Sequence, residues 1–192
     1  MFKDLVQRNR SYRRFYQDVP VERTLLVELV DLARLTPSAA NRQPLKYILS
    51  SEPEKNALIF PHLYWAGYLK DWPGPREGER PAAYILVLGD REITPSFGCD
   101  HGIAAQTILL GAAAKELGGC MLSAVDREKL TEALKIPRRY EILLVLALGK
   151  PKEQVTLEPV GPEGNIKYYR DDKDIHHVPK RLLSEVILED WD

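Results

Sequence analysis

The sequence has few cysteines and no excess of charge of either sign. Cys99 and Cys120 are its only two cysteines, and they are not spaced as a CxxC pair. Two thiols are too few for the disulfide framework of a small secreted protein, and they fit a protein of the reducing cytosol. The 27 Lys and Arg residues nearly balance the 28 Asp and Glu residues. The protein therefore has no global electrostatic attraction to nucleic acid or to a membrane surface.

Long hydrophobic runs are also missing. The longest nearly uncharged stretch lies between Gly102 and Lys115 and holds 12 residues. A membrane-spanning helix needs about 20 apolar residues, so this stretch predicts a buried helix of a globular protein. The segment from Met1 to Arg14 is basic and lacks the apolar centre of a secretory signal. We therefore expect a cytoplasmic protein without a membrane segment.

Patterns typical of metal centres and dinucleotide sites are absent from the sequence. Cys99, Asp100 and His101 are adjacent, so their side chains point in different directions and would rarely chelate one ion. We expect Asp100 to cap a helix and Cys99 to be a small buried residue. For the pair His176 and His177 we expect a structural or solvated role in a loop. No G-x-G-x-x-G motif follows a predicted strand, so a dedicated nicotinamide dinucleotide site has no support.

The apolar residues recur at periods that predict both helices and strands. Helices are predicted over Pro20–Leu35, His62–Trp72, Asp100–Leu117 and Asp126–Lys135, and strands over Leu45–Ser50, Ala82–Leu88 and Ile142–Leu148. The third helix is apolar on nearly every side and is expected inside the fold, ending at Gly118 and Gly119. The run Pro73–Pro81 is rich in proline and glycine, which predicts an exposed loop. The sum is a mixed α/β domain with buried strands and a buried central helix.

The composition changes after Pro151. The remaining residues are more charged and have no strong period until Leu182–Leu188. A polar tail of this kind cannot form a core of its own, so we expect it to wrap around a partner subunit.

Basic residues gather near the N-terminus, where Arg8, Arg10, Arg13 and Arg14 surround Ser11. Guanidinium groups bind phosphate oxygens through paired hydrogen bonds, and a serine hydroxyl adds another. The cluster therefore predicts a phosphate site. A solvated basic end, or a nucleic-acid-binding segment, is an alternative interpretation of the same residues.

The segment Thr36–Pro44, with the sequence TPSAANRQP, combines a tight turn with two side-chain amides. Asn41 and Gln43 offer both hydrogen-bond donors and acceptors. A heteroaromatic ligand needs such partners, because each buried polar group left unpaired costs about 1–3 kcal/mol. Alternatively, these amides only satisfy the backbone of their own loop.

Taken together, these segments resemble a known family. RSYRRF, PSAANRQP about 25 residues later, and the DHGIAAQ segment followed by Gly-Gly are similar to the nitroreductase-like flavoproteins, which use FMN. The motifs AVDREKLTEALKIP, ILLVLALGKP and HVPKR extend the resemblance over nearly the whole chain. It implies an α+β fold with a central mixed or antiparallel sheet flanked by helices, forming a single domain over residues 1–192. It further implies an intertwined homodimer with two FMN sites at the interface, the tail from about residue 151 extending onto the partner.

The resemblance also implies which residues bind FMN. Arg10, Ser11 and Arg13 match the element that holds the phosphate and the polar edge of the ring, and Lys180 and Arg181 match a basic pair that completes the phosphate site.

Two further segments are implied to contact the flavin ring. The PSxxNxQP loop contacts the flavin from the neighbouring subunit, and it corresponds to Ser38, Asn41 and Gln43. The turn whose backbone lies along the isoalloxazine near N5 corresponds to Leu122, Ser123 and Ala124.

The activity implied by the resemblance is that of an FMN-dependent oxidoreductase. NAD(P)H would deliver hydride to flavin N5, and two electrons would pass by a ping-pong mechanism to a second substrate of nitroaromatic or quinone type. The aromatic stretch Tyr64–Trp72 is hypothesised to form a wall or lid over the flavin, with packing in the core or dimer seam as the alternative. Two other functions stay open: a flavoprotein of the same fold that serves storage, sensing or flavin breakdown, and a nucleic-acid-binding module.

Overall fold

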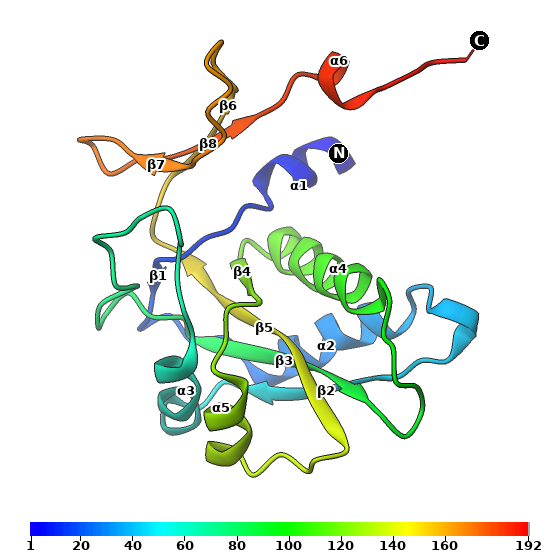
Figure 1. The fold of residues 1–192 in the computed structure, drawn as a ribbon. Coiled ribbons are helices and arrows are strands. Elements are labelled where there is room, and N and C mark those ends of the chain that lie inside the picture. Colours follow the sequence, from blue (N-terminus) through cyan, green and yellow to red (C-terminus); the bar gives the residue numbers. More distant parts are fainter. Residues whose placement is uncertain (192) are drawn as a thin grey trace. The chain divides into compact units, whose positions relative to one another are not determined.

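The computed structural model describes residues 1–191 and divides the chain into two compact units (Figure 1). The first unit contains Met1–Trp65 and Pro73–Lys152. The second contains Ala66–Trp72 together with the chain from Glu153 onward. Within the described residues no helix has the length and apolar character that crossing a membrane would require.

The first unit is built from helices around one antiparallel sheet. Its helices are α1 (Phe2–Arg8), α2 (Arg23–Arg34), α3 (Pro53–Ile59), α4 (Asp100–Ala114) and α5 (Arg127–Ala133), with short 3₁₀ helices at Ala39–Asn41 and Phe60–His62. Its strands are β1 (Phe15–Tyr16), β2 (Leu45–Ser50), β3 (Ala83–Asp90), β4 (Gly118–Leu122) and β5 (Tyr140–Pro151). The five-stranded sheet has the order β1-β5-β3-β2, and β4 also pairs with β5. Every pairing in it is antiparallel, which agrees with the expected α+β class.

The core lies between the sheet and the helices α2 and α4. Strand β3 is buried at every position, because it has β2 on one side and β5 on the other. Leu26 of α2, Ile85 of β3 and Ile108 of α4 belong to one buried cluster. The predicted central strand and the predicted buried helix are therefore confirmed.

Helix α4 begins at Asp100, as predicted, but its cap and its end differ from the prediction. Its N-cap residue is Cys99, and the helix ends at Ala114 instead of Leu117. Glu116, with φ of 61°, takes the left-handed conformation that was expected of glycine. Gly118 and Gly119 begin β4, where a Cβ on Gly119 would lie 2.7 Å from the backbone oxygen of Ala147. These glycines therefore allow a close approach of strands and do not terminate the helix.

The predicted helix over His62–Trp72 is wrong. Leu63 forms an isolated bridge with Val125, and Ala66 has a φ of 43°, a left-handed conformation that cannot continue a helix. The loop Pro73–Pro81 is also less exposed than predicted, because Gly74 and Glu79 are both buried. At Gly74 an added Cβ would lie 2.7 Å from Cδ1 of Trp65, so this indole packs directly on the loop backbone.

Two amphipathic helices of the first unit follow the prediction closely. Helix α2 begins at Arg23, three residues after the predicted start, and buries Leu26, Leu29 and Ala33. Asp126 caps α5 by accepting a hydrogen bond from the backbone nitrogen of Lys129 at 3.3 Å.

The second unit has a small sheet that the sequence did not predict. It consists of β6 (Val155–Pro159), β7 (Tyr169–Arg170) and β8 (His176–Lys180), followed by the single-turn helix α6 (Leu183–Val186). Strand β8 pairs in parallel with β6 and antiparallel with β7. The segment Ala66–Trp72 belongs to this unit, where the ring of Tyr68 lies 4.9 Å from that of Tyr168.

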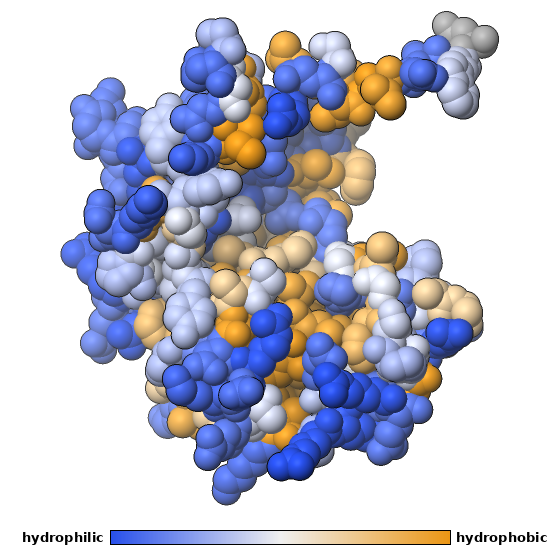
Figure 2. Space-filling model, viewed as in Figure 1, coloured by the Kyte–Doolittle hydropathy of each residue, from blue (hydrophilic) through white to orange (hydrophobic). Residues whose placement is uncertain are grey.

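The C-terminal segment presents apolar side chains to solvent in a single chain. Leu183 is 71% exposed, Leu188 is 96% exposed and Trp191 is 90% exposed. Figure 2 shows hydrophobic side chains on the surface of α6. Exposed apolar surface of this kind is typical of an interaction site, as the expectation of a partner subunit requires.

Candidate functional site

The N-terminal arginine segment lies against the beginning of β4. Ser11 forms an isolated parallel bridge with Gly119, and the backbone nitrogen of Tyr12 donates to the oxygen of Gly119 at 3.0 Å. The ring of Tyr12 covers Gly118, where a Cβ would collide with it. The fold therefore fixes the position of the Arg10–Arg13 segment relative to the central sheet.

One side chain of this segment, that of Arg10, retains hydrogen-bonding capacity. Arg10 donates from Nη2 to the oxygen of Val6 at 2.7 Å, while its Nε is buried and has no hydrogen-bond partner among residues 1–191. Arg13 is 9% exposed and donates from Nη1 to the oxygen of Ser11 at 3.2 Å. Because buried N–H groups without an acceptor are rare, Arg10 fits a site for an anionic group.

The turn after β4 forms the other end of this region. Leu122 is buried, whereas Ser123 and Ala124 are exposed. The oxygen of Ser123 accepts from Arg127, and the oxygen of Ala124 accepts from the backbone nitrogen of Tyr64, both at 3.0 Å. A strand rises about 3.3 Å per residue, so the turn lies roughly 13 Å along β4 from Gly119. This arrangement suits an elongated ligand with an anionic end at the arginines and a flat end at the turn.

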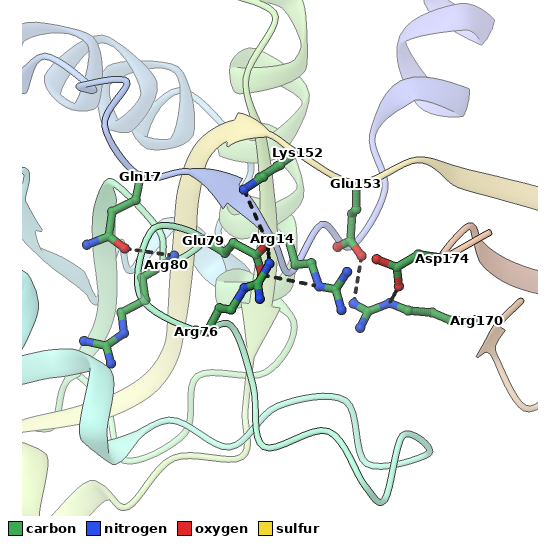
Figure 3. A network of polar contacts seen from close by, with 9 residues as sticks. All are labelled: Arg14, Gln17, Arg76, Glu79, Arg80, Lys152, Glu153, Arg170 and Asp174. Carbon is green, nitrogen blue, oxygen red and sulfur yellow. Dashed lines mark hydrogen bonds and ion pairs between the residues drawn. The ribbon is translucent and has the colours of Figure 1, made fainter. Parts of the chain in front are cut away.

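A buried carboxylate fixes the chain just after the arginine segment (Figure 3). The side chain of Glu79 is 8% exposed and lies 3.7 Å from Nε of Arg14, 3.3 Å from Nη2 of Arg76 and 3.4 Å from Nζ of Lys152. Its backbone oxygen accepts from Phe15 at 3.0 Å. The sequence does not reveal this role of Glu79, because a single acidic residue in a proline-rich loop carries no signal of its partners.

A second carboxylate holds the loop that contains Ser38. The hydroxyl of Ser38 donates to Oδ2 of Asp100 at 2.6 Å, and the backbone nitrogen of Ala39 donates to Oδ1 at 3.1 Å. Gln43 donates from its backbone nitrogen to Oγ of Ser38 at 2.9 Å. The prediction that Asp100 caps α4 is therefore wrong, because its oxygens serve a distant loop. The prediction that Cys99 is buried is wrong as well, since its position at the N-cap leaves it exposed.

Asn41 and Gln43 lie in strained backbone at the tip of the same loop. Their φ angles are 53° and 51°, and that of Ala40 is 50°. Nε2 of Gln43 donates to the backbone oxygen of Asn41 at 3.2 Å and to its Oδ1 at 3.1 Å. These bonds agree with amides that satisfy their own loop, and both side chains are also exposed to a ligand. Non-glycine residues in this region of φ are uncommon and concentrate at functional sites.

Within one chain these two groups of residues lie at opposite ends of α4 (Figure 1). The Ser38 loop is bonded to Asp100, the first residue of the helix, and β4 follows its last turn. A helix rises 1.5 Å per residue, so the ends of α4 are about 21 Å apart. The structure therefore brings the Arg10–Arg13 segment and the turn of Ser123 onto one strand, and it does not bring the Ser38 loop to them.

Lys180 and Arg181 lie in the second unit. Lys180 is the last residue of β8, and its oxygen accepts from Val160 at 2.9 Å. Nη1 of Arg181 lies 3.7 Å from Oε1 of Glu185. Both basic side chains are exposed, and their convergence with Arg10 on one phosphate stays a prediction.

The residues of the aromatic stretch Tyr64–Trp72 differ in their surroundings, so the lid interpretation and the packing interpretation each fit some of them. Leu63 pairs with Val125, so the stretch starts beside the turn after β4, and Tyr64 is 60% exposed there. Trp65 is buried, as expected for packing. Trp72 lies in the second unit, with the guanidinium of Arg170 4.3 Å above its ring.

The histidine pair is structural, but it lies in strand β8 and not in a loop. Nδ1 of His177 lies 2.9 Å from Oε2 of Glu158, and its Nε2 lies 3.2 Å from Oδ2 of Asp171. The ring of Tyr169 stacks on His177 at 4.8 Å. The hydrogen bond to Asp171, followed by that to Glu158, raises the pKa of His177. Among residues 1–191, no three His, Cys, Asp or Glu side chains are grouped to hold a metal ion.

Comparison with known proteins gives a consistent result. Residues 6–74 and 78–150 match the Nitroreductase family. The 5,6-dimethylbenzimidazole synthase of Rhodospirillum rubrum is 25% identical over 173 residues, which cover 78% of this chain and 82% of that protein. YodC of Bacillus subtilis, named as a candidate NAD(P)H nitroreductase, is 21% identical over 177 residues, which cover 77% of this chain and 88% of that protein.

A solved structure shares the fold. A protein of Exiguobacterium sibiricum crystallised in complex with FMN superimposes with a TM-score of 0.65 and is 19% identical. The superposition covers 80% of this chain and 89% of that protein. The motifs identified in the sequence, the α+β architecture and these matches agree, and the chain belongs to the nitroreductase family.

Proposed function

We propose that this protein is an FMN-dependent oxidoreductase that takes hydride from NAD(P)H and delivers two electrons to a nitroaromatic or quinone-like substrate. The observation that carries the proposal is the arrangement along β4. The Arg10–Arg13 segment pairs with the start of the strand, and the exposed turn of Ser123 and Ala124 follows its end. An anionic group and a flat ring on one ligand match these two ends.

Arg10, Ser11 and Arg13 would hold the phosphate of FMN. A phosphate monoester carries nearly two negative charges, and two guanidinium groups balance them. The buried Nε of Arg10 supplies a donor that the described protein does not use. In this proposal Lys180 and Arg181 complete the phosphate site.

The turn of Leu122, Ser123 and Ala124 would orient the ring. The side chains of Ser123 and Ala124 are small, so a planar group can approach the backbone closely. Bound FMN would supply the redox chemistry, since its N5 accepts hydride from a reduced nicotinamide and its reduced form gives two electrons to an acceptor. The residues of this chain bind the cofactor, orient it and exclude water from one of its faces.

The proposed site needs two copies of the chain. Ser38, Asn41 and Gln43 would reach the flavin from the neighbouring subunit, because the length of α4 separates them from the arginine segment of their own chain. The exposed apolar residues from Leu182 to Trp191 support a homodimer, since a second copy would cover them.

A second candidate is a flavoprotein of the same fold that does not turn over NAD(P)H. The Rhodospirillum rubrum relative favours it, because that protein is named as a synthase and not as a reductase.

An anaerobic titration separates these candidates. Purified protein loaded with FMN would be mixed with NADH and, separately, with NADPH while flavin absorbance is recorded. We expect at least one of the two to bleach the flavin, and added p-benzoquinone to restore it. A yellow protein that neither reductant bleaches would support the second candidate. A protein that retains no flavin absorbance after FMN is added and the unbound FMN is removed would exclude both flavoprotein candidates. The nucleic-acid-binding alternative would then remain.

A matched pair of variants tests the phosphate site. Arg10→Ala is expected to weaken FMN binding at least tenfold, because hydrogen bonds between charged groups are the strong ones. Arg138→Ala, a change at an exposed arginine far from this segment in the sequence, is expected to leave FMN affinity within twofold. Quenching of flavin fluorescence on binding measures the FMN affinity of both variants. Equal effects of the two changes would contradict the assignment.

A further inference from the structure

A cavity of about 340 Å³ opens in the first unit, away from the residues proposed to bind FMN. It lies between the turn after β1, the start of α3 and the start of β3. Its volume falls within the range of small-molecule sites. The flat, apolar side chains of Pro20, Pro53, Phe60 and Pro81 form much of its wall. A planar ring fits between such surfaces.

One arginine in the wall of this cavity has hydrogen-bonding capacity to spare. The guanidinium of Arg80 lies 4.4 Å above the ring of Phe60, which holds it in one orientation. Its Nε is buried and has no hydrogen-bond partner within residues 1–191. Figure 3 shows that its side chain points away from Glu79, around which the neighbouring cations gather. No described carboxylate lies within ion-pair distance of Arg80.

Two of the other polar side chains that line this cavity refine the choice of ligand. Tyr84 is 1% exposed, and burial raises the pKa of its hydroxyl far above the ordinary value, so that it stays protonated and able to donate. Asp18 lines the cavity as well without pairing with Arg80. A carboxylate there repels a second anionic group of a ligand and attracts a hydroxyl or amino group.

We propose that this cavity binds a small aromatic carboxylate that carries a hydroxyl or amino substituent. The carboxylate would pair with the planar guanidinium of Arg80, whose fork of donors matches its two oxygens. The ring would lie against Phe60 and the prolines, and the substituent would donate to Asp18. This site is independent of the proposed flavin site.

Calorimetric titration of the intact, FMN-loaded protein with 4-hydroxybenzoate tests the proposal. We expect binding of one molecule per chain, and binding of the neutral 4-hydroxybenzamide at least tenfold weaker. Arg80→Gln should weaken the binding of 4-hydroxybenzoate at least tenfold. Arg80→Lys, which keeps the charge and loses the planar fork, should give an intermediate affinity. Arg138→Gln, at an exposed arginine outside the cavity, should have no effect.

Two controls keep the test decisive. The thermal midpoint of each variant shows that it is folded, so that loss of binding reports on the site. Flavin absorbance is recorded during every titration, because a benzoate bound at the flavin would perturb that spectrum and would survive Arg80→Gln. The proposal is overturned if wild-type protein binds no 4-hydroxybenzoate at millimolar concentration, if the amide binds equally well, or if Arg80→Gln leaves the affinity unchanged.

Discussion

The hydrogen bonds between the Ser38 loop and Asp100 offer the most direct test of how the fold prepares its site. Asp100 accepts from the hydroxyl of Ser38 at 2.6 Å and from the backbone nitrogen of Ala39 at 3.1 Å. Ser38 in turn accepts from the backbone nitrogen of Gln43 at 2.9 Å. Replacing Asp100 therefore removes the charge that holds together a loop with three left-handed residues.

The size of the effect follows from the number of bonds and the burial of the acceptor. Hydrogen bonds to a charged group contribute about 1.5–3 kcal/mol each. Part of the loss in the variant is offset, because the variant no longer has the free-energy cost of burying a charged carboxylate. Asp100 is 6% exposed and accepts two such bonds, so we expect Asp100→Ala to lower the free energy of unfolding by about 2–4 kcal/mol. Asp100→Asn keeps an acceptor oxygen and should cost about half as much. Ser38→Ala loses one charged and one neutral bond and should cost about 2–4 kcal/mol.

Urea unfolding of these single variants, and of the double variant of Ser38 and Asp100, measures the coupling. Groups in one network couple by about 0.5–3 kcal/mol, whereas independent sites add within about 0.5 kcal/mol. Glu132→Ala, at an exposed acidic residue of α5, serves as the control and should change stability by less than about 0.5 kcal/mol. Additive effects at Ser38 and Asp100, or an Asp100→Ala variant as stable as wild type, would refute the reasoning.

Three further predictions concern charged side chains. Because the pKa of His177 is raised in the folded protein, protonation of this side chain stabilises the fold. This contribution is fully present below pH 6.5, the ordinary pKa of histidine. This stabilisation is lost as pH rises through the folded-state pKa. The His177→Gln variant should therefore lose that part of the pH dependence in urea unfolding, and an unchanged profile would contradict it. Arg139 holds the pKa of buried Asp90 below its ordinary value of 3.8 through bonds of 2.8 and 2.6 Å, so this stabilisation is present above pH 3.8 and is lost as pH falls through the lowered pKa. Acid unfolding followed by circular dichroism should begin at higher pH in Asp90→Asn than in the wild type. If the wild type unfolded at the higher pH, the result would argue against a stabilising pair of Arg139 and Asp90. Glu79→Gln leaves three cations without their shared carboxylate and should lower the urea-unfolding free energy by about 1–3 kcal/mol; a variant as stable as the wild type would show that the cluster contributes nothing.

Parts of the fold could be predicted because local sequence determines them. Strand β2 occupies Leu45–Ser50 as predicted, since a short apolar run there is bounded by a proline and a polar turn. Strand β3 is a continuous apolar run that only a central position in a sheet can bury on both faces. The cap of α5 at Asp126 is equally local.

Other parts depend on contacts between residues far apart in sequence. The stretch after His62 has helical spacing of its aromatics, yet Leu63 pairs with Val125 and the chain turns at Ala66. Strand β8 holds two histidines and a proline, so its apolar pattern is weak, and it forms only by pairing with β6 and β7. A single-sequence pattern contains neither pairing.

The same distinction applies to the candidate site. Each segment that we propose to bind FMN is a compact motif, so residues such as Arg10, Ser38 and Ser123 could be identified from the sequence. The side chains that hold these segments could not. Asp100 lies 62 residues from Ser38, and Glu79 acts on an arginine of the N-terminal segment. Their roles follow from the fold and not from any local spacing.

The central claim is that two copies of this chain together hold FMN. Sedimentation velocity of the FMN-loaded protein, followed by flavin absorbance, tests it most directly. We predict one flavin-coloured species with twice the 21.9 kDa mass of a single chain, carrying one FMN per chain. Flavin absorbance that does not sediment with the protein, or that sediments at the mass of a single chain, would contradict the account.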